Sequence, residues 1–365
     1  MFSPLIKALH NLNIFDGEKT RNGWVVLDGV SVVQIGYSDE YKNLEHSFED
    51  AQGGFLSPKL VETHVHGGSG NSNDDGADSM QGVLDFQKSN GVGRSFLSLV
   101  SAPIEKTLEL IKQAKQVEND SFLGLHLEGP FISNEFKGAH NPQVIHGPTD
   151  DELAEIIDTG KGIIRSITIA PELTTKSQVQ KLLDNGIMPC FGHSNANYEQ
   201  AQEFFGLGSK VMTHAFNAMN GIHHRTPGPI PAAFEEGAYT ELIADGVHVQ
   251  PAAARLLNPE KVILVTDAMV ATAMEDGDYT LGSLKVIVRD GVARTESGAI
   301  AGSTLMLKRA VKNYAEWIGS AELSLKAAIT NPALAYGLEP KRIAKGETEW
   351  LLWDSDLNLI DQSAN

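Results

Sequence analysis

The sequence predicts an α/β protein built on a (β/α)₈ TIM-like barrel, with a small β domain formed by the two chain ends. Eight short apolar runs recur between residues 60 and 267, most of them separated by helix-like segments, and strand-like segments flank this region on both sides. The 365 residues are 41% hydrophobic and 21% charged, which is ordinary for a globular chain. An α/β barrel can use about 250 residues as one unit. A doubly wound open sheet is the weaker alternative.

The eight expected strands follow one another in the order that a barrel requires. Amphipathic stretches at 104–117 and 174–186 separate some of them, and the second closes on Gly186, a usual helix stop. Strand and helix alternating eight times is the pattern of the barrel. The expected strands are LVETHVH (60–66), SFLSLV (95–100), FLGLHLE (122–128), IIRSITIA (163–170), IMPCFGH (187–193), KVMTH (210–214), ELIAD (241–245) and VILVTD (262–267).

Two segments lie outside this count at the chain ends. Residues 1–58 and the tail from 338 to 365 show short strands and turns, so we expect them to pair into one small domain beside a barrel of residues 59–337. After the eighth strand, residues 279–298 resemble a β-hairpin insertion. Asp290 and Gly291 supply its turn.

Composition and charge exclude several classes of partner. The net charge is −18, with 47 acidic against 29 basic residues, which argues against nucleic acid or an anionic membrane as a partner. No run of about 18 apolar residues occurs, so we expect no membrane span, and the first 15 residues do not form a convincing signal peptide. Cys190 is the only cysteine, which excludes an internal disulfide and is compatible with the cytoplasm.

Polar side chains cluster where the expected strands end. Side chains alternate faces along a strand, so Glu128 points into the barrel, and His64 and His66 share one inward face. His193, His214 and Asp267 are each the last residue of an expected strand. Barrel chemistry occurs at the C-terminal strand ends. A lone histidine there is more often structural, but four histidines and two carboxylates together predict a metal site. A metal would also explain why a carboxylate is buried at residue 128.

Six motifs, in order, resemble those of the N-acetylglucosamine-6-phosphate deacetylases of the amidohydrolase superfamily. The resemblance implies a metal-dependent enzyme that hydrolyses the acetamide of N-acetylglucosamine 6-phosphate to glucosamine 6-phosphate and acetate. It also implies a small β-sandwich built from both chain ends, and a homodimer. The motifs are GLHLEGPFIS followed by KGAHNP, FGHSNA, THAFNAM, IADGVHV, LVTDA and AGSTL.

The resemblance also implies roles for individual residues. Glu128, His193 and His214 match the main metal ligands, and Asp267 matches the acid–base that takes a proton from water and delivers it to the leaving amine. His140 would hydrogen-bond the acetyl oxygen. The arginine of the FNAM–HHR loop would reach the phosphate across the dimer interface. The substrate-contacting positions are Ala139, His140, Asn217, Ala218, Arg225, His248, Ala301, Gly302 and Ser303.

The first strand departs from the family pattern. Lys59 and Glu62 stand where the family has glycine and aspartate. Some members lack the histidine pair on this strand and work with one metal, whereas His64 and His66 are present here. We therefore expect one or two divalent ions, zinc first, with iron(II), manganese or cobalt as alternatives. The tail is short, and no closing strand is expected after residue 358.

Three other functions remain open on the sequence. The first is deacetylation of the galactosamine epimer, because one inverted hydroxyl is read by few contacts. The second is hydrolysis of a cyclic amide, although enzymes of that kind commonly place a modified lysine at the end of strand four, where this chain has none. The third is a non-enzymatic sugar-phosphate-binding barrel, which would not need Asp267.

Overall fold

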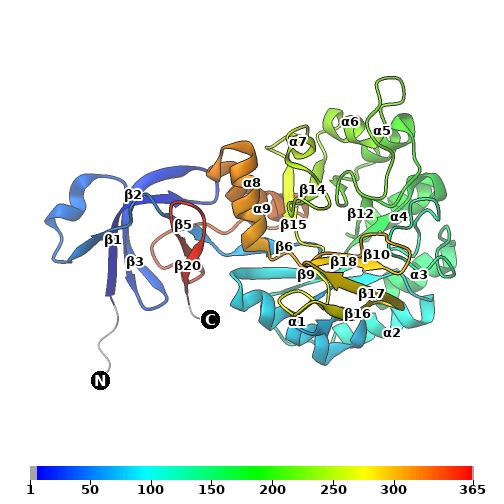
Figure 1. Cartoon of the computed structure of the whole chain (residues 1–365), viewed down its shortest axis with the longest axis horizontal. Helices are drawn as coiled ribbons and strands as arrows, with labels where there is room; N and C mark the ends of the chain where they lie inside the picture. Colours follow the sequence, from blue (N-terminus) through cyan, green and yellow to red (C-terminus); the bar gives the residue numbers. More distant parts are fainter. Residues whose placement is uncertain (1–5, 364–365) are drawn as a thin grey trace.

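The computed structural model describes residues 6–363, and its main feature is a sheet of eight parallel strands that follow one another in chain order. Each of the eight apolar runs contributes one strand, so the predicted barrel is confirmed. Figure 1 shows the helices arranged around this sheet. The strands are β6 (Leu60–Glu62), β9 (Val92–Val100), β10 (Phe122–Glu128), β11 (Ile164–Ile169), β12 (Met188–Phe191), β13 (Val211–Met212), β14 (Tyr239–Ile243) and β15 (Val262–Val265).

The barrel closes between its first and last strands just beyond the ends of β6 and β15. Val65 and Ala268 form a parallel bridge there. Glu62, the last residue of β6, also links the two strands. Its carboxylate is fully buried and accepts hydrogen bonds from the backbone N–H groups of His64 (2.9 Å) and Thr266 (3.1 Å). Burial raises the pKa of Glu62 to about 8. A side chain thus links the two strands where the backbone ladder is short.

The helices between the strands begin and end at recognisable signals. Thr149 and Thr175 each open a helix with a reciprocal capping box, closed by Glu152 and Gln178. Gly186 follows α4 with φ 71°, as expected of a helix stop. The helices are α1 (Ala77–Ser89), α2 (Ile104–Ala114), α3 (Asp150–Thr159), α4 (Lys176–Asp184), α5 (Tyr198–Gly206), α6 (Pro229–Glu235), α7 (Pro251–Ala254), α8 (Leu307–Ile318) and α9 (Ala321–Ala335), with short 3₁₀ turns η1 (Asp39–Asn43), η2 (Asn73–Asp75) and η3 (Pro171–Leu173). Within residues 6–363, no helix is long and apolar enough to cross a membrane.

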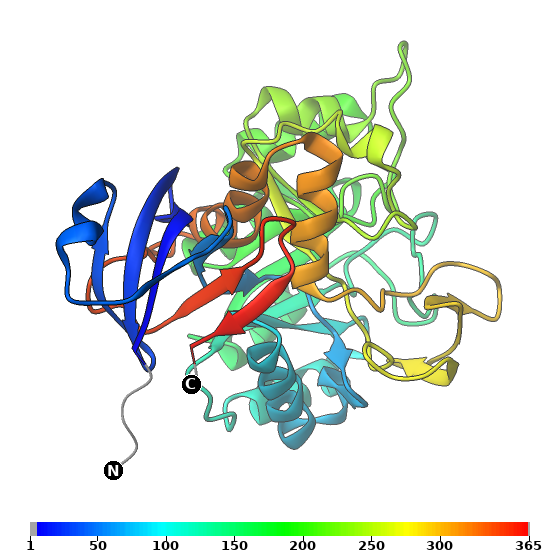
Figure 2. The ribbon, with the colours of Figure 1, turned by 60° about the vertical axis from the view of Figure 1, so that its left-hand side comes forward.

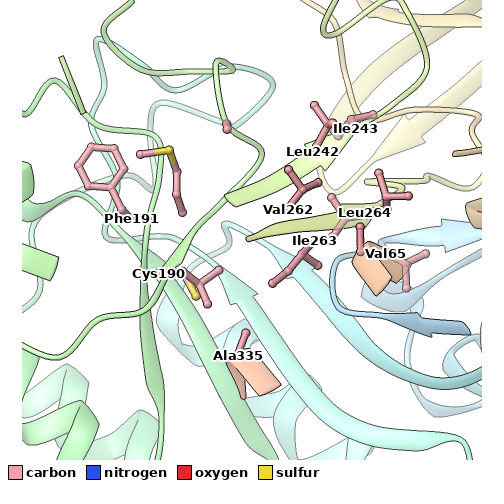
Figure 3. Packing of buried hydrophobic residues seen from close by; sticks show 14 of the residues in the cluster. Val65, Cys190, Phe191, Leu242, Ile243, Val262, Ile263, Leu264 and Ala335 are labelled. Atoms are coloured by element: carbon pink, nitrogen blue, oxygen red, sulfur yellow. The ribbon is translucent and has the colours of Figure 1, made fainter. Parts of the chain in front are cut away.

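The main core lies between the strands and the surrounding helices. Figure 3 shows apolar side chains of one buried cluster, among them Cys190, Leu242 and Ile263 of neighbouring strands and Ala335 of α9. Leu125 and Leu127 of β10 belong to the same cluster. Because side chains alternate along β10, Leu125 and Leu127 leave its other face to His126 and Glu128.

Both chain ends contribute to one seven-stranded sheet (Figure 2). Its strands are β1 (Ile6–Phe15), β2 (Thr20–Asp28), β3 (Ser31–Gly36), β4 (Phe48–Asp50), β5 (Phe55–Pro58), β19 (Trp350–Trp353) and β20 (Leu359–Gln362). Side chains from both ends, such as Leu12, Val25 and Leu352, share one apolar cluster. Residues 1–5 and 364–365 of the predicted domain lie outside the described residues.

The expectation that the tail ends without a closing strand is wrong, because β20 pairs antiparallel with β19. The reason is a tight turn that reverses the chain. Asp354 accepts backbone hydrogen bonds from Asp356 (3.0 Å) and Asn358 (2.8 Å), and Leu357 takes a left-handed φ of 57°. The segment is too short for its alternation to have marked it as a strand.

The insertion after the eighth strand is a three-stranded antiparallel sheet of β16 (Gly277–Leu281), β17 (Leu284–Arg289) and β18 (Val292–Thr295). The predicted turn joins β17 to β18, with φ 51° at Asp290 and 71° at Gly291. A shorter pair, β7 (Gly67–Gly68) and β8 (Asn71–Ser72), follows the first barrel strand.

Candidate metal centre

The six side chains predicted to converge do meet at one end of the barrel, with Glu128 at their centre. Glu128 is the last residue of β10 and is 4% exposed. Its Oε1 lies 3.0 Å from Nε2 of His214 and 3.1 Å from Nε2 of His193. Its Oε2 lies 3.1 Å from Nε2 of His66. Nε2 of His64 lies 3.6 Å from Oε1, so one carboxylate lies between His193 and His214 on one side and the histidine pair that follows the first strand on the other.

The second group comes from the first and eighth strands. Nε2 of His64 and Nε2 of His66 are 3.2 Å apart, and Oδ1 of Asp267 lies 3.3 Å from Nε2 of His66. The backbone holds this group together, because Asp267 N–H donates to the carbonyl of His64 (2.9 Å) and Ser303 N–H donates to the carbonyl of Asp267 (2.7 Å). The closure of the barrel thus positions the site.

Three of the predicted strand-end residues lie beyond their strands. His193, His214 and Asp267 each follow the end of a strand by two residues, and their φ angles are 46°, 27° and 50°. A non-glycine residue in this region costs on the order of 1–3 kcal/mol. Such strain is typical of functional sites, since the surrounding structure must impose it. The ladder ends earlier than the apolar runs suggested.

The charges at the centre hold one another in place. Burial opposes ionisation of Glu128, but the charge of His64 and the hydrogen bonds from His140 and His193 keep its pKa well below the usual range. Burial also opposes ionisation of Asp267, yet its hydrogen bond to His66 and the charge of His64 lower its pKa to about 2. Both carboxylates are therefore anionic near neutral pH.

The donor set fits a divalent cation. Nε2 atoms face one another at 3.0 Å between His193 and His214, and at 3.2 Å between His64 and His66. Two unprotonated nitrogens at that distance repel, whereas a cation binds both lone pairs. In each of two sets of side chains, all the ligand atoms lie within 4.8 Å of one another. These sets are His64, His66, Glu128 and Asp267, and Glu128, His140 and His193. Imidazole and carboxylate are the ligands of catalytic metal sites with an open position.

His140 approaches the same centre from the loop after β10. Its Nε2 lies 3.3 Å from Oε2 of Glu128, and burial lowers its pKa to about 4, so the ring is neutral near pH 7. Ser101 lies behind the ring, with its backbone N–H 3.4 Å and its Oγ 2.8 Å from Nδ1. The backbone N–H of Ser101 can only donate, so Nδ1 of His140 accepts it and the remaining proton belongs on Nε2, which faces Glu128.

A pocket of about 320 Å³ opens over Glu128, His193, His214 and Asp267. His248 lines it and is oriented by Asp245, whose Oδ2 lies 2.7 Å from Nδ1. Asp245 also accepts the backbone N–H of His248. The predicted substrate residues that line the pocket are Ala139, His140, Asn217, Ala218, His248 and Gly302.

The structure places the three other predicted substrate residues elsewhere. Ala301 is fully buried in the apolar cluster of the insertion. Ser303 is buried beside Asp267, and its Oγ donates to the carbonyl of Thr266 (2.6 Å). Arg225 is exposed and lines a separate cavity of about 330 Å³ with residues of the α5 and α6 region. Within one chain, therefore, Arg225 does not face the metal centre.

Sequence reasoning missed two residues that support the centre. Ser101 follows the second barrel strand and contacts both His140 and the carbonyl of Glu128. Glu241 lies inside β14, 1% exposed, with Oε2 3.2 Å from Nδ1 of His64. The position of Glu241 could have been noticed in the sequence, because an acidic residue inside an otherwise apolar barrel strand indicates a buried polar contact. Nothing in the local sequence distinguished Ser101.

Comparisons with known proteins agree on one family. A model of the amidohydrolase family matches residues 55–351. N-acetylglucosamine-6-phosphate deacetylase of Vibrio furnissii is 36% identical over 78% of this chain and 74% of that protein. N-acetylgalactosamine-6-phosphate deacetylase of Escherichia coli O157:H7 is 35% identical over 78% of each. An aspartate-to-alanine variant of the Mycobacterium smegmatis deacetylase, solved with N-acetyl-D-glucosamine-6-phosphate, superimposes with a TM-score of 0.88 at 31% identity, covering 97% of this chain and 96% of that one.

Proposed function

The chain belongs to the amidohydrolase family and within it to the N-acetylglucosamine-6-phosphate deacetylases, and from this premise we propose that it hydrolyses the acetamide of N-acetylglucosamine 6-phosphate. The products are acetate and glucosamine 6-phosphate. The observation that carries the proposal is the convergence of histidines and carboxylates around Glu128 at the floor of a pocket sized for a small molecule. Asp267 is present at the centre, and a protein that only binds sugar phosphates would not need it, so we favour an enzyme over a binding protein.

A divalent metal ion is the cofactor. We assign Glu128, His193 and His214 to the first ion, and His64 and His66 to a second, with Glu128 facing both groups. Zinc is our first choice, because imidazole and carboxylate sets with an open position hold catalytic zinc. Iron(II), manganese and cobalt accept the same ligands. When bound, such an ion lowers the pKa of its water from about 15.7 toward about 7 and polarises the substrate carbonyl.

The ion count gives the first prediction. We expect the parent protein to hold up to two ions per chain and the His64→Asn and His66→Asn variants to hold one, because each change removes a nitrogen facing the 3.2 Å gap between the two rings. Metal analysis of the dialysed proteins measures this. A constant content of one ion in the parent and in both variants would remove the second site from the proposal.

The chain's own residues supply the proton transfers. Asp267, ionised and lining the pocket, can take a proton from the attacking water and deliver it to the amide nitrogen as the carbon–nitrogen bond breaks. His140 can donate its Nε2 proton to the acetyl oxygen as negative charge builds there. Both side chains lie beside Glu128, so the acetyl group belongs at that end of the pocket.

The sugar phosphate would occupy the rest of the pocket. His248, Asn217 and the backbone at Ala218 and Gly302 supply polar groups away from Glu128. Positive φ at Ala218 (49°) shows that this backbone is held in an unusual conformation at the pocket wall. Ala139 lines the pocket beside His140. These residues are our candidates for binding the substrate.

We further propose a homodimer in which Arg225 of one chain reaches the phosphate bound by the other. The loop that carries Arg225 projects from the molecule between β13 and α6 (Figure 2), and Arg225 lines a cavity separate from the pocket over Glu128. Ile222 on this loop and Phe234 on α6 expose large apolar side chains, at 47% and 60%. A second chain covering them would bring the planar donor fork of arginine to the phosphate oxygens.

Phosphate recognition gives the second prediction. Arg225→Met should lower kcat/KM for the 6-phosphorylated sugar by about 10–150-fold, because hydrogen bonds to a charged group contribute about 1.5–3 kcal/mol. The unphosphorylated sugar is the internal control, since it should be hydrolysed far more slowly by the parent and no worse by the variant. Equal kcat/KM for the two sugars in the parent would show that the phosphate is not recognised.

The direct test of the function is acetate release from both 6-phosphorylated epimers. The galactosamine epimer is the second candidate, because the relatives acting on the two epimers are 36% and 35% identical to this chain. If protein that contains metal releases acetate from neither substrate, the proposed activity is refuted. The single cysteine suits a reducing compartment, and we propose a cytoplasmic enzyme.

A further inference from the structure

Glu241 is a fully buried carboxylate that the proposed chemistry does not use. It lies on β14 and is 1% exposed. Its Oε1 accepts a hydrogen bond from Oγ1 of Thr63 (3.1 Å) and lies 3.5 Å from the hydroxyl of Tyr336. Its Oε2 lies 3.2 Å from Nδ1 of His64. Burying a carboxylate is costly unless it is paired and hydrogen-bonded, so the contact with His64 calls for a reason.

The contact determines which nitrogen of His64 faces the centre without a proton. A carboxylate only accepts, so Nδ1 of His64 must carry the hydrogen that bonds to Glu241. In the neutral ring, Nε2 then has a free lone pair. This Nε2 faces Nε2 of His66 at 3.2 Å, Oε1 of Glu128 at 3.6 Å and Oδ1 of Asp267 at 3.7 Å. When the ring gives up its second proton to a cation, the contact with Glu241 therefore leaves Nε2, and not Nδ1, as the ligand atom.

The other histidines of the centre are held by weaker partners. Nδ1 of His193 faces the backbone carbonyl of Phe136 at 2.8 Å. Nδ1 of His66 and Nδ1 of His214 are buried without a hydrogen-bond partner among the described residues. A carboxylate behind a ligating histidine fixes its orientation and raises its basicity. Among these rings, therefore, His64 has the partner best suited to strengthen metal binding.

We propose that Glu241 is a positioning residue for the second metal ion, acting through the tautomer and orientation of His64. The inference rests on the proposed two-ion centre. It names a residue on the seventh strand, outside the lining of the substrate pocket, as a determinant of the affinity for the second ion. The first ion, held by Glu128, His193 and His214, does not depend on Glu241, because none of its assigned ligands contacts that carboxylate in the described chain.

The test is a metal titration of the apo protein against a chromophoric chelator, which reports both dissociation constants without using activity. In Glu241→Gln the second ion should bind about 10–100-fold more weakly, while the first keeps its parental affinity. Glutamine retains the shape and can still meet Thr63 and Tyr336, but it lacks the negative charge. Tyr336→Phe is the matched control, since it removes the 3.5 Å contact at Oε1 and leaves Oε2 facing His64, and both affinities should stay parental.

A second pair of variants separates positioning from general disruption. In a His64→Asn background, which should hold only the first ion, Glu241→Gln should leave the affinity for that ion and the ion count unchanged, because the ring through which Glu241 acts is gone. Should Glu241→Gln not fold, Glu241→Asp withdraws the carboxylate from Nδ1 and must show the same selective loss. Parental affinity for the second ion in the variant that folds overturns the proposal, as does equal weakening of both ions.

The parent distinguishes this inference from the function on which it rests. A parent that binds one ion and releases acetate keeps the deacetylase function and overturns the role of Glu241. A parent that binds two ions, with the selective loss in Glu241→Gln but without acetate release, supports the role of Glu241 and refutes the function.

Discussion

Replacing Glu128 with glutamine should weaken binding of both ions by about 10²–10⁴-fold and reduce acetate release accordingly. Its two oxygens lie between 3.0 and 3.3 Å from the Nε2 atoms of His66, His140, His193 and His214. Removing one partner from a buried group of charges costs about 3–5 kcal/mol. Glutamine keeps the volume but has one acceptor and no charge, so it cannot face both groups of ligands.

Metal analysis of the purified variant, together with an acetate assay at saturating metal, measures this effect. Glu172→Gln is the matched control. Glu172 lies beside the centre on η3 and bonds Ser194 (2.6 Å) and the backbone of Asn195 (2.6 Å), next to His193. Its loss should leave the metal content unchanged. If Glu128→Gln keeps two ions at parental affinity, Glu128 is not the shared ligand and the centre is assembled differently.

The sequence predicted the centre well because strand parity and strand ends are local properties. Alternation along residues 122–128 placed Glu128 inward, and the same argument placed His64 and His66 together. The precise strand ends could not be read in this way. The ladders of β12, β13 and β15 stop two residues before the predicted ends, since His193, His214 and Asp267 adopt positive φ. Only the assembled site imposes that conformation.

Other features depend on contacts between distant segments, which single-sequence patterns do not contain. Glu241 and His64 are 177 residues apart in the chain. Ser101 and His140 belong to different loops. β20 forms only because a turn at Asp354 returns the chain onto β19. Arg225 was assigned to the phosphate by resemblance, and in the single chain it lies in a separate cavity. Its role therefore depends on a second chain, which the sequence does not describe.

Asp267→Asn should lower kcat by at least about two decades, because general acid–base groups contribute about 10²–10⁴-fold. Burial alone would raise the pKa of Asp267, but its hydrogen bond to His66 and the charge of His64 hold it at about 2, so the carboxylate is ionised at neutral pH and its lone pairs are free for the proton of the water. A carboxylic acid of such low pKa then gives the proton readily to the leaving amine. Asparagine keeps the size and the backbone bonds to His64 and Ser303 but can do neither.

The decisive comparison is between kcat and the two binding constants of this variant. Metal content and substrate affinity should change little, because the assigned ligands of the first ion and the residues lining the pocket remain. Asp276→Asn is the matched control, since that aspartate only accepts backbone hydrogen bonds in the insertion, including one from Gly291 (3.1 Å), and its kcat should stay parental. Near-parental kcat in Asp267→Asn would contradict the proton-transfer role. If the variant instead loses both metal and substrate binding, Asp267 is a metal ligand. An acid–base group that does not bind the metal can be replaced by a neutral side chain without releasing the ion.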